Sequence, residues 1–385
     1  MTRWVVTATI RAIGTAVPAT TLDQGRVRDL FSSQPGLGRL GSRLVPAAFD
    51  ASAVDHRHTV LDELDSSRSG GAFRDDHGTL RSPTTGARND RYRELAPPLF
   101  VAAARDAVER AGVAPERITH LVTVSCTGFT QPGPDIDVVE QLGLPAGVFR
   151  HHIGFMGCCA AFPALRIAAA FAEADPDAVV LVVCAELCTL HVRASDDPDQ
   201  IVANSVFGDG AAAAVVAADG AGLRLEGFAT AVVPEGASEM AWNIGDEGFE
   251  MVLSTAVPKL VGAHVPGAVA PLLAHVGAPA DVPVWAVHPG GRAILDRTQE
   301  ALGLPDTAMV SSRRVLREHG NMSSATVLFV LRDAVDAGLE DGSGVLALAF
   351  GPGLTVESAR LTAVRTEASP AVEPQRAPVV TTGAA

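Results

Sequence analysis

The chain has 385 residues, of which 47% are apolar, so it is long enough for one large domain or two medium ones around a sizeable core. Its formal net charge of −14 excludes the basic face that a nucleic-acid partner requires, although a few local arginines could still hold an anionic ligand. We found no apolar run typical of a membrane span, and residues 1–10 do not resemble a signal peptide. We therefore expect a globular cytoplasmic protein with neither a nucleic-acid nor a membrane partner.

The first half of the chain begins with an apolar stretch over 8–18 that predicts a strand ending in a turn. Residues 62–90 are rich in Ser, Gly, Arg and Asp, which predicts an exposed loop. A helix is expected from Ala96, with prolines near its start and Gly112 at its end. Short apolar strands then alternate with alanine-rich helical segments, which predicts an α/β architecture with strands over 118–124, 178–184 and 211–217 and a helix over 158–173.

The second half repeats this order, with strands expected over 284–287 and 344–350 and a helix over 321–337. Each half also carries a glycine-rich turn beside a strand. We therefore expect two similar halves, 1–221 and 222–363. Residues 364–385 are rich in proline and polar residues without periodicity, which predicts a disordered tail.

The cysteines number five and all lie between residues 126 and 188, with no pair of Cys-x-x-Cys motifs that would predict structural zinc. An odd count in one cluster favours a reducing compartment. Cys158 follows Gly157 where a helix is expected to begin, and the positive end of a helix stabilises a thiolate. The alternative is that Cys158, like its neighbour Cys159, is a small buried apolar residue.

Two further residues have settings that suit catalysis. His288 ends a buried strand and is followed by Pro-Gly-Gly, a turn that would hold an imidazole at the rim of a sheet. Asn321 follows Gly320 and precedes an apolar helix, so it is either a helix N-cap or an amide donor aimed at a developing oxyanion. A thiolate, a base and an oxyanion donor together predict acyl transfer through a thioester. The sequence context of Cys158 excludes a papain-like protease.

Several motifs occur in one order along the chain, and together they resemble the type III polyketide synthases, the chalcone synthase-like branch of the thiolase superfamily, in its bacterial form. The resemblance runs from about Ala8 to Leu361. It rests on Gly157-Cys158, Phe207-Gly-Asp-Gly-Ala-Ala-Ala213, His288-Pro-Gly-Gly291, Gly320-Asn-Met-Ser-Ser-Ala325 and Gly351-Pro-Gly-Leu-Thr-Val-Glu357. It implies a thiolase-like α/β fold in which two similar halves form five layers, αβαβα.

The resemblance also implies the chemistry of the site. Cys158 would carry the starter and the growing chain, and His288 would keep its thiolate ionised. His288 and Asn321 would polarise malonyl-CoA, whose decarboxylation gives the enolate that attacks the acyl-Cys. The substrates would be malonyl-CoA and an acyl-CoA starter, with no metal or redox cofactor, and the enzyme would be a homodimer.

The residues expected to line the cavity depart in part from the plant pattern. Phe207 matches one gatekeeper phenylalanine, whereas Met251 replaces the second and Trp242 occupies a position that is glycine in plant enzymes. Cys126 is similar to a cysteine of bacterial tetrahydroxynaphthalene synthases. These departures leave the reaction class intact and the starter, the number of extensions and the cyclisation open. The other residues that the resemblance places at the cavity are Cys188, His191 and Ser323.

The family holds CoA at positions that correspond here to Arg57, Gly290, Gly291, Arg292 and Ala293. An arginine suits contacts with phosphate, although most surface arginines are only solvated charges. Two other functions stay open at this point. One is a single condensation on a carrier protein, as in β-ketoacyl-acyl carrier protein synthase III, and the other is an inactive binding subunit with the same fold.

Overall fold

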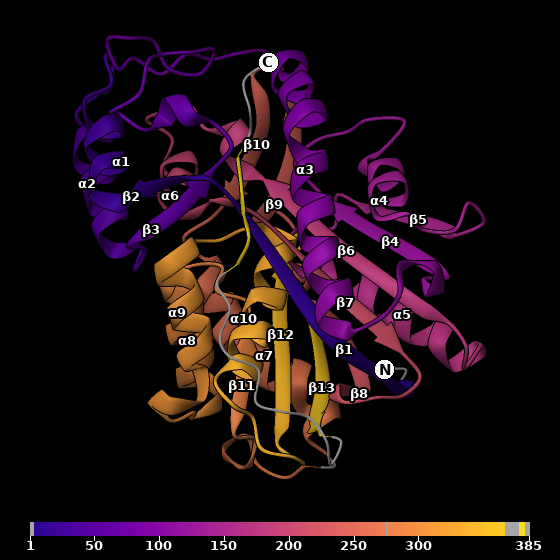
Figure 1. The fold of residues 1–385 in the computed structure, drawn as a ribbon. Helices are drawn as coiled ribbons and strands as arrows, with labels where there is room; N and C mark the ends of the chain where they lie inside the picture. The colour runs from indigo at the N-terminus through magenta and orange to yellow at the C-terminus, as the bar shows by residue number, and fades with distance from the viewer. Residues whose placement is uncertain (1–3, 275, 366–376, 382–385) are drawn as a thin grey trace.

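Most strands form one large mixed sheet in the computed structural model, which describes residues 4–274, 276–365 and 377–381. Along its path the strands follow the order β11-β12-β13-β8-β1-β7-β6-β4-β5 (Figure 1). The strands of the first half are β1 (Trp4–Pro18), β4 (His120–Ser125), β5 (Phe149–Gly154), β6 (Val179–Leu187) and β7 (Asp209–Ala217). Those of the second half are β8 (Gly222–Val232), β11 (Val284–Val287), β12 (Gly344–Gly351) and β13 (Thr355–Val364).

The two halves repeat one strand pattern. In the first, β1 pairs antiparallel with β7, β7 antiparallel with β6, and β6 parallel with β4. In the second, β8, β13, β12 and β11 pair in the same order with the same directions. The expected α/β fold with two similar halves is therefore confirmed. We propose that the halves divide before Gly222, where β8 begins.

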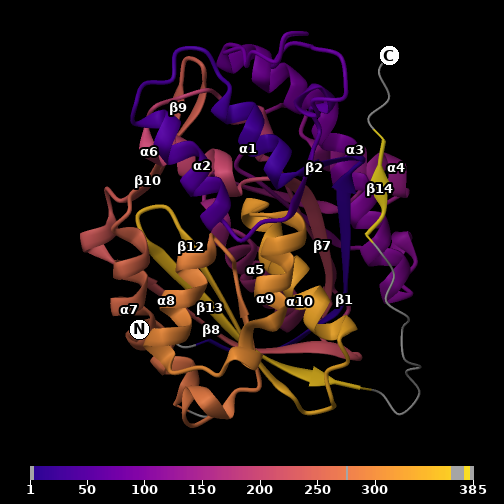
Figure 2. The ribbon, with the colours of Figure 1, turned by 90° about the vertical axis from the view of Figure 1, so that its left-hand side faces the viewer.

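Helices cover and separate the two parts of the sheet in five layers. Buried residues of α5 (Ala161–Ala174) and α10 (Thr326–Asp336) form one core with strands of both halves. The outer face of the first-half strands packs on α3 (Thr85–Ala111), and that of the second-half strands packs on α7 (Val257–Leu273) and α8 (Arg292–Leu302). Figure 2 shows these layers nearly edge-on, in the order α7 and α8, strands, α10 and α5, strands, α3.

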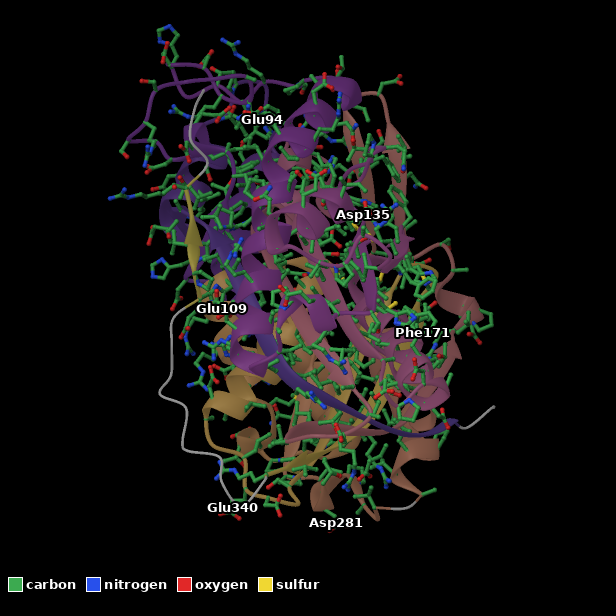
Figure 3. The ribbon with its side chains drawn as sticks, turned by 45° about the vertical axis from the view of Figure 1, so that its right-hand side comes forward. Glu94, Glu109, Asp135, Phe171, Asp281 and Glu340 are labelled. Carbon is green, nitrogen blue, oxygen red and sulfur yellow. The ribbon has the colours of Figure 1, made fainter. Side chains whose placement is uncertain are left out.

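Smaller elements complete the fold around these layers. Figure 3 shows Glu94 and Glu109 on the outer side of α3, where such side chains contribute to the acidic surface. A hairpin near the upper end of the sheet lines the site described below, and two short strands pair with each other beside the sheet (Figure 1). The remaining elements are β2 (Thr20–Asp23), α1 (Gln24–Ser32), α2 (Gly41–Ala51), β3 (His56–Thr59), α4 (Pro134–Leu142), α6 (Pro198–Val206), β9 (Met240–Gly245), β10 (Gly248–Leu253), α9 (Val310–His319) and β14 (Val379–Val380), with single 3-10 turns between them.

The expected exposed loop over 62–90 is only partly correct. Helix α3 already begins at Thr85, where the Thr84 side chain accepts a hydrogen bond from the Ala87 N–H, and its prolines lie inside the helix rather than at its start. Packing of apolar side chains on both sides of the prolines holds the helix together despite the missing N–H groups. Within the remaining loop, Phe73 and Leu80 are buried in the core, so the loop is anchored.

The expected disordered tail is also partly wrong. Most of 366–385 lies outside the described residues, but Val379 and Val380 form β14, which pairs in parallel with the end of β1. The Val17 N–H donates to the Pro378 carbonyl at 3.2 Å, and Val380 packs against the first-half core. The backbone groups of β1 that are free of β7 and β8 at this point explain the pairing.

One helical stretch, Gly157–Ala174, is apolar and long enough to cross a membrane by length and composition, although the sequence predicted no membrane span. Half of this stretch is buried inside the protein, where α5 lies between the two layers of strands. Its apolar character therefore serves the core of the fold.

Candidate active site

The turn before α5 presents Cys158 to an internal cavity. Gly157, Cys158 and Cys159 form a single 3-10 turn, and Gly157 has a φ of 68°, a conformation that glycine adopts without strain. A Cβ at Gly157 would overlap Pro352 in the turn between β12 and β13, so no other residue fits there. The nucleophile of the first half therefore rests directly against a turn of the second half.

The cavity has a volume of about 410 Å³ and lies among α2, α6, the β9–β10 hairpin, α7 and the N-terminus of α8. Cys158, His288 and Asn321 all line it, although 130 residues or more separate Cys158 from each of the other two along the chain. Among the predicted cavity and CoA residues, those that line it are Cys126, Cys188, His191, Gly290, Gly291, Phe207, Trp242, Met251, Arg292, Ala293 and Ser323.

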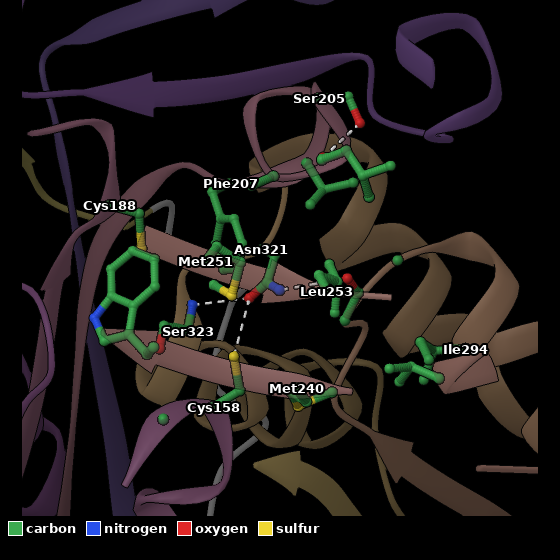
Figure 4. A pocket seen from close by; sticks show the side chains of 18 of the residues that line it. Cys158, Cys188, Ser205, Phe207, Met240, Met251, Leu253, Ile294, Asn321 and Ser323 are labelled. Carbon is green, nitrogen blue, oxygen red and sulfur yellow. Dashed lines mark hydrogen bonds between the residues drawn. The ribbon is translucent and has the colours of Figure 1, made fainter. Parts of the chain in front are cut away.

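The amide of Asn321 faces the sulfur of Cys158 (Figure 4). Its Oδ1 atom accepts a hydrogen bond from the Ser323 N–H at 2.8 Å and lies 4.0 Å from the Cys158 Sγ atom. Because the Ser323 N–H can only donate, it fixes the amide with Nδ2 as the remaining donor. Nδ2 makes one long bond of 3.4 Å, to the Gly290 carbonyl. The Asn321 side chain thus stabilises its own turn through Oδ1, and its Nδ2 donor makes only one long hydrogen bond.

The imidazole of His288 is buried at the end of β11. Its backbone N–H donates to the Leu348 carbonyl at 2.7 Å, which extends the pairing of β11 with β12 by one residue. Neither ring nitrogen has a hydrogen-bond partner among the described residues. Burial lowers the pKa of His288 to about 3, so the imidazole is neutral and available as a base or donor.

The raised pKa of the Cys158 thiol keeps it neutral near pH 7. Its pKa is raised to about 11, chiefly by burial, which outweighs the opposing hydrogen bond with Ser323, and the nearby Glu186 acts in the same direction as burial. A thiolate therefore requires a base beside it to take the proton. Among the described residues, no three His, Cys, Asp or Glu side chains are grouped closely enough to hold a metal ion.

Trp242 and His191 form an inner wall of the cavity. The indole N–H of Trp242 donates to the Cys126 carbonyl at 2.8 Å, which fixes the ring. The His191 ring stacks on Phe249 at 4.1 Å, its Nε2 atom donates to the Thr127 carbonyl at 2.9 Å, and its Nδ1 atom accepts the Phe249 N–H at 3.0 Å. Because both ring nitrogens are hydrogen-bonded, the His191 ring is neutral and held in one orientation in the cavity wall.

Glu186 is a buried residue near the site that the sequence reading missed. It lies on β6, and one of its carboxylate oxygens accepts bonds from the Cys126 N–H at 2.9 Å and the Thr127 hydroxyl at 3.0 Å. Burial raises its pKa to about 7. Its sequence signal was a lone acidic residue at the end of an otherwise apolar strand.

The prediction that Arg57 holds CoA is wrong, because its guanidinium is enclosed. Arg57 is 3% exposed and does not line the cavity. It donates to the carbonyls of Asn204 at 2.6 Å and Phe207 and Ser205, each at 2.9 Å, and to the side chain of Gln24. Nothing in the local sequence distinguishes such a buried arginine from a surface one.

The carbonyls that Arg57 holds belong to the end of α6 and to Phe207, which follows it. The Asn321 N–H donates to the Val206 carbonyl at 2.8 Å, and the Gly208 N–H donates to the Asn321 carbonyl at 3.0 Å. Phe207 and Asn321 are therefore joined as a short parallel bridge. By holding the Phe207 carbonyl, Arg57 braces this bridge and so links Phe207 to Asn321.

Arg292 occupies the outer part of the cavity at the N-terminus of α8. Its side chain is 58% exposed and pairs with Asp296 at 3.5 Å. Glycines 290 and 291 precede it and leave the backbone open to a ligand. Of the two predicted CoA arginines, Arg292 alone is placed where a phosphate could reach it.

Comparisons with known proteins agree with this geometry. The family model for chalcone and stilbene synthases matches with its N-terminal domain over residues 3–220 and with its C-terminal domain over residues 224–365. The chain belongs to the chalcone and stilbene synthase family.

A curated relative in this family is the "Alpha-pyrone synthesis polyketide synthase-like Pks18" of Mycobacterium tuberculosis. It is 32% identical over 366 residues, which are 91% of this chain and 90% of the relative. The crystal structure of 1,3,6,8-tetrahydroxynaphthalene synthase from Streptomyces coelicolor A3(2), a bacterial type III polyketide synthase, is similar with a TM-score of 0.84 and 28% identity, over 93% of this chain and 100% of that one.

The structure of PKS-I from the brown alga Ectocarpus siliculosus is similar with a TM-score of 0.85 and 29% identity, over 94% of this chain and 99% of that one. The likeness to type III polyketide synthase structures confirms the thiolase-like fold expected from the sequence.

Two substitutions test whether Arg57 serves the structure and Arg292 serves CoA binding. Arg57→Met leaves several buried carbonyls without a donor, so we expect the free energy of unfolding to fall by about 3 kcal/mol, with binding of CoA unchanged. Arg292→Met, the matched variant at the mouth, should weaken CoA binding and leave stability unchanged. Chemical denaturation and titration calorimetry measure the two quantities. Weaker CoA binding by a fully stable Arg57→Met variant would contradict this assignment.

Proposed function

We propose that this family member is a type III polyketide synthase that loads an acyl group on Cys158 and extends it repeatedly with malonyl-CoA. The observation that carries the proposal is the convergence of Cys158, His288 and Asn321 on one apolar cavity. Family membership and relatives named as polyketide synthases support it. The single condensation on a carrier protein is not favoured by these comparisons.

Loading begins with the thiol of Cys158. The neutral His288 imidazole takes the proton from Sγ, and the thiolate attacks the thioester carbonyl of the starter. A new bond forms between Sγ and the acyl carbon, the bond from that carbon to the CoA sulfur breaks, and the proton passes from His288 to the departing CoA thiolate. Burial favours this step because both groups begin and end neutral.

In the extension step, His288 and Asn321 act as hydrogen-bond donors to the thioester oxygen of malonyl-CoA. Loss of carbon dioxide from malonyl-CoA breaks a carbon–carbon bond and leaves the electron pair as an enolate, with its charge on the thioester oxygen. The His288 imidazole N–H and the Asn321 Nδ2 donor stabilise that oxygen, and in an apolar cavity such donors act more strongly than in water. The enolate carbon attacks the acyl-Cys carbonyl and expels the Cys158 thiolate. These steps require no metal or redox cofactor.

The walls of the cavity set which chains fit. Phe207 and Met251 stand at the gatekeeper positions, while Cys126, Cys188, His191, Trp242 and Ser323 bound the interior. We infer that the finished chain is cyclised to a pyrone, resorcinol, phloroglucinol or naphthalene-type ring. CoA is held at the mouth by Arg292, with Gly290, Gly291 and Ala293 beside it.

We further propose a homodimer that works in the cytoplasm. Strand β5 lies at the edge of the sheet, Phe149 on it is 64% exposed, and Met156 just beyond it is 40% exposed. An edge strand with a free backbone side and exposed apolar side chains at and beyond its ends favours addition of a second copy. The five cysteines are all free thiols, which favours a reducing compartment.

Product analysis tests the reaction class. With malonyl-CoA alone, and with a panel of acyl-CoA starters, mass spectrometry should detect polyketides extended by more than one unit. The Cys158→Ala variant should give none. Product formation from malonyl-acyl carrier protein but not from malonyl-CoA would favour the single-condensation enzyme. Neither product formation nor alkylation of Cys158 by iodoacetamide would favour an inactive binding subunit.

The role of His288 predicts an effect on the reactivity of Cys158. Burial leaves both the resting thiol and the resting imidazole neutral, so His288 acts as a general base that takes the proton from Sγ as the thiol reacts. We expect His288→Ala to slow iodoacetamide alkylation at neutral pH by about a hundredfold, the usual contribution of such a base. Peptide mapping of the label, with Cys158→Ala as the control, restricts the measurement to this thiol. Superimposable pH profiles of the wild type and His288→Ala would exclude the role.

Trp242 predicts an effect on product size. Trp242→Gly removes the indole and the bond to the Cys126 carbonyl, so the cavity becomes deeper on that side. We expect longer products or a broader range of starters, with the malonyl-CoA decarboxylation rate nearly unchanged. Product profiles by mass spectrometry measure this. An identical profile would show that the indole does not bound the growing chain.

A further inference from the structure

Two cavity-lining residues carry buried polar atoms without a hydrogen-bond partner among the described residues. One is His288, through both ring nitrogens, and the other is Gln200, through its Oε1 atom. Gln200 is 4% exposed and lies on α6. A buried amide oxygen without a donor is unfavourable unless a ligand or water supplies one. Gln200 thus shares the feature that marks the proposed catalytic base.

A chain of hydrogen bonds fixes the orientation of the Gln200 amide. The Asn204 Nδ2 atom donates to the Arg193 carbonyl at 2.8 Å, which leaves Asn204 Oδ1 as an acceptor. The Gln200 Nε2 atom donates to that Oδ1 atom at 3.0 Å. Because a backbone carbonyl can only accept, reversing Asn204 would lose its bond to Arg193, and reversing Gln200 alone would bring two oxygens together. Gln200 therefore offers an acceptor, its Oε1 atom.

Hydrogen bonds of neighbouring residues place Gln200 in the cavity wall between Met251 and His191, both of which are proposed to shape the cavity. The adjacent Asp199 accepts the Leu253 N–H at 3.1 Å, which ties α6 to the strand that carries Met251. On the other side, the relay ends at Arg193, which follows Val192 of the cavity wall and His191. The acceptor thus lies beside the interior of the cavity.

We propose that Gln200 is a specificity residue whose Oε1 atom accepts a hydrogen bond from an N–H or O–H group of the acyl thioester. The donor is either an amide N–H of the pantetheine arm or a hydroxyl on the starter. This inference rests on the proposed function, since it assumes that acyl-CoA thioesters occupy the cavity. A thioester that lacks the donor leaves Oε1 buried and unpaired, so it binds less well.

The test compares Gln200→Leu with a matched control, Gln34→Leu. Gln34 is also a buried glutamine, but both ends of its amide are bonded, to the Leu30 and Gly78 carbonyls and the Leu80 N–H. It does not line the cavity. Gln34→Leu should therefore lower stability and leave selectivity unchanged. Gln200→Leu loses one bond, to Asn204 Oδ1, so it should lower stability less than Gln34→Leu does, and it should alter selectivity.

Selectivity is measured with malonyl thioesters of CoA, N-acetylcysteamine and propanethiol, of which the last has no amide. If the donor is a pantetheine amide, Gln200→Leu lowers kcat/KM for decarboxylation of malonyl-CoA about tenfold and leaves the propanethiol thioester unaffected. N-Acetylcysteamine keeps one of the two amides, so it identifies which amide is contacted. If the donor is a starter hydroxyl, acylation of Cys158 by 4-hydroxybenzoyl-CoA falls while acylation by benzoyl-CoA does not.

The inference is overturned if Gln200→Leu changes none of these rates, or lowers the rate with the propanethiol thioester as much as the others. The same holds if Gln34→Leu alters selectivity in the same way. A wild-type protein that decarboxylates no malonyl thioester would instead refute the proposed function, so the two failures are distinguishable.

Discussion

The site depends on the close packing of two turns that belong to different halves of the chain. Gly157 leaves no room for a Cβ beside Pro352, and Gly351 leaves none beside the Cys159 sulfur. On α5, which follows the first of these turns, Arg166 pairs with the buried Glu357 of β13. Glu357 also accepts a hydrogen bond from the Thr230 hydroxyl of β8 at 2.8 Å. These contacts set the depth at which Cys158 enters the cavity, and they explain why residues far apart in sequence converge there.

Burial sets the electrostatics of the same site. The cavity walls raise the pKa of Cys158 and lower that of His288, so the resting pair is neutral, and charge arises only when a substrate is present to share it. The braced bridge between Phe207 and Asn321 then holds a donor ready without reorganisation. Apolar walls such as Trp242 and Phe249 complete an enclosure that favours enolate chemistry over reaction with water.

Local patterns in the sequence predicted strands β1, β4, β6, β7, β11 and β12 but not β5, β8 or β13, and they singled out three residues that line one cavity. A glycine before a cysteine, a strand that ends at a histidine and a Gly-Asn turn are each visible without a fold. Interactions between distant segments were not, and they account for the errors. Whether Arg57 is buried or exposed depends on the carbonyls of α6. The pairing of β14 depends on free backbone groups of β1. The helical state of 85–95 depends on packing against the core. Gln200 had no local signal at all, because only the fold shows that its amide oxygen lacks a donor.

The central claim is that a single sulfur, that of Cys158, carries the acyl group while an enolate forms beside it. Peptide mass spectrometry after brief mixing with an acyl-CoA starter tests this most directly. We expect the acyl mass on the peptide that contains Cys158 and on no other cysteine peptide, and its loss when malonyl-CoA is added. An acyl group on Cys126 or Cys188 instead, or extended products from the Cys158→Ala variant, would contradict the account.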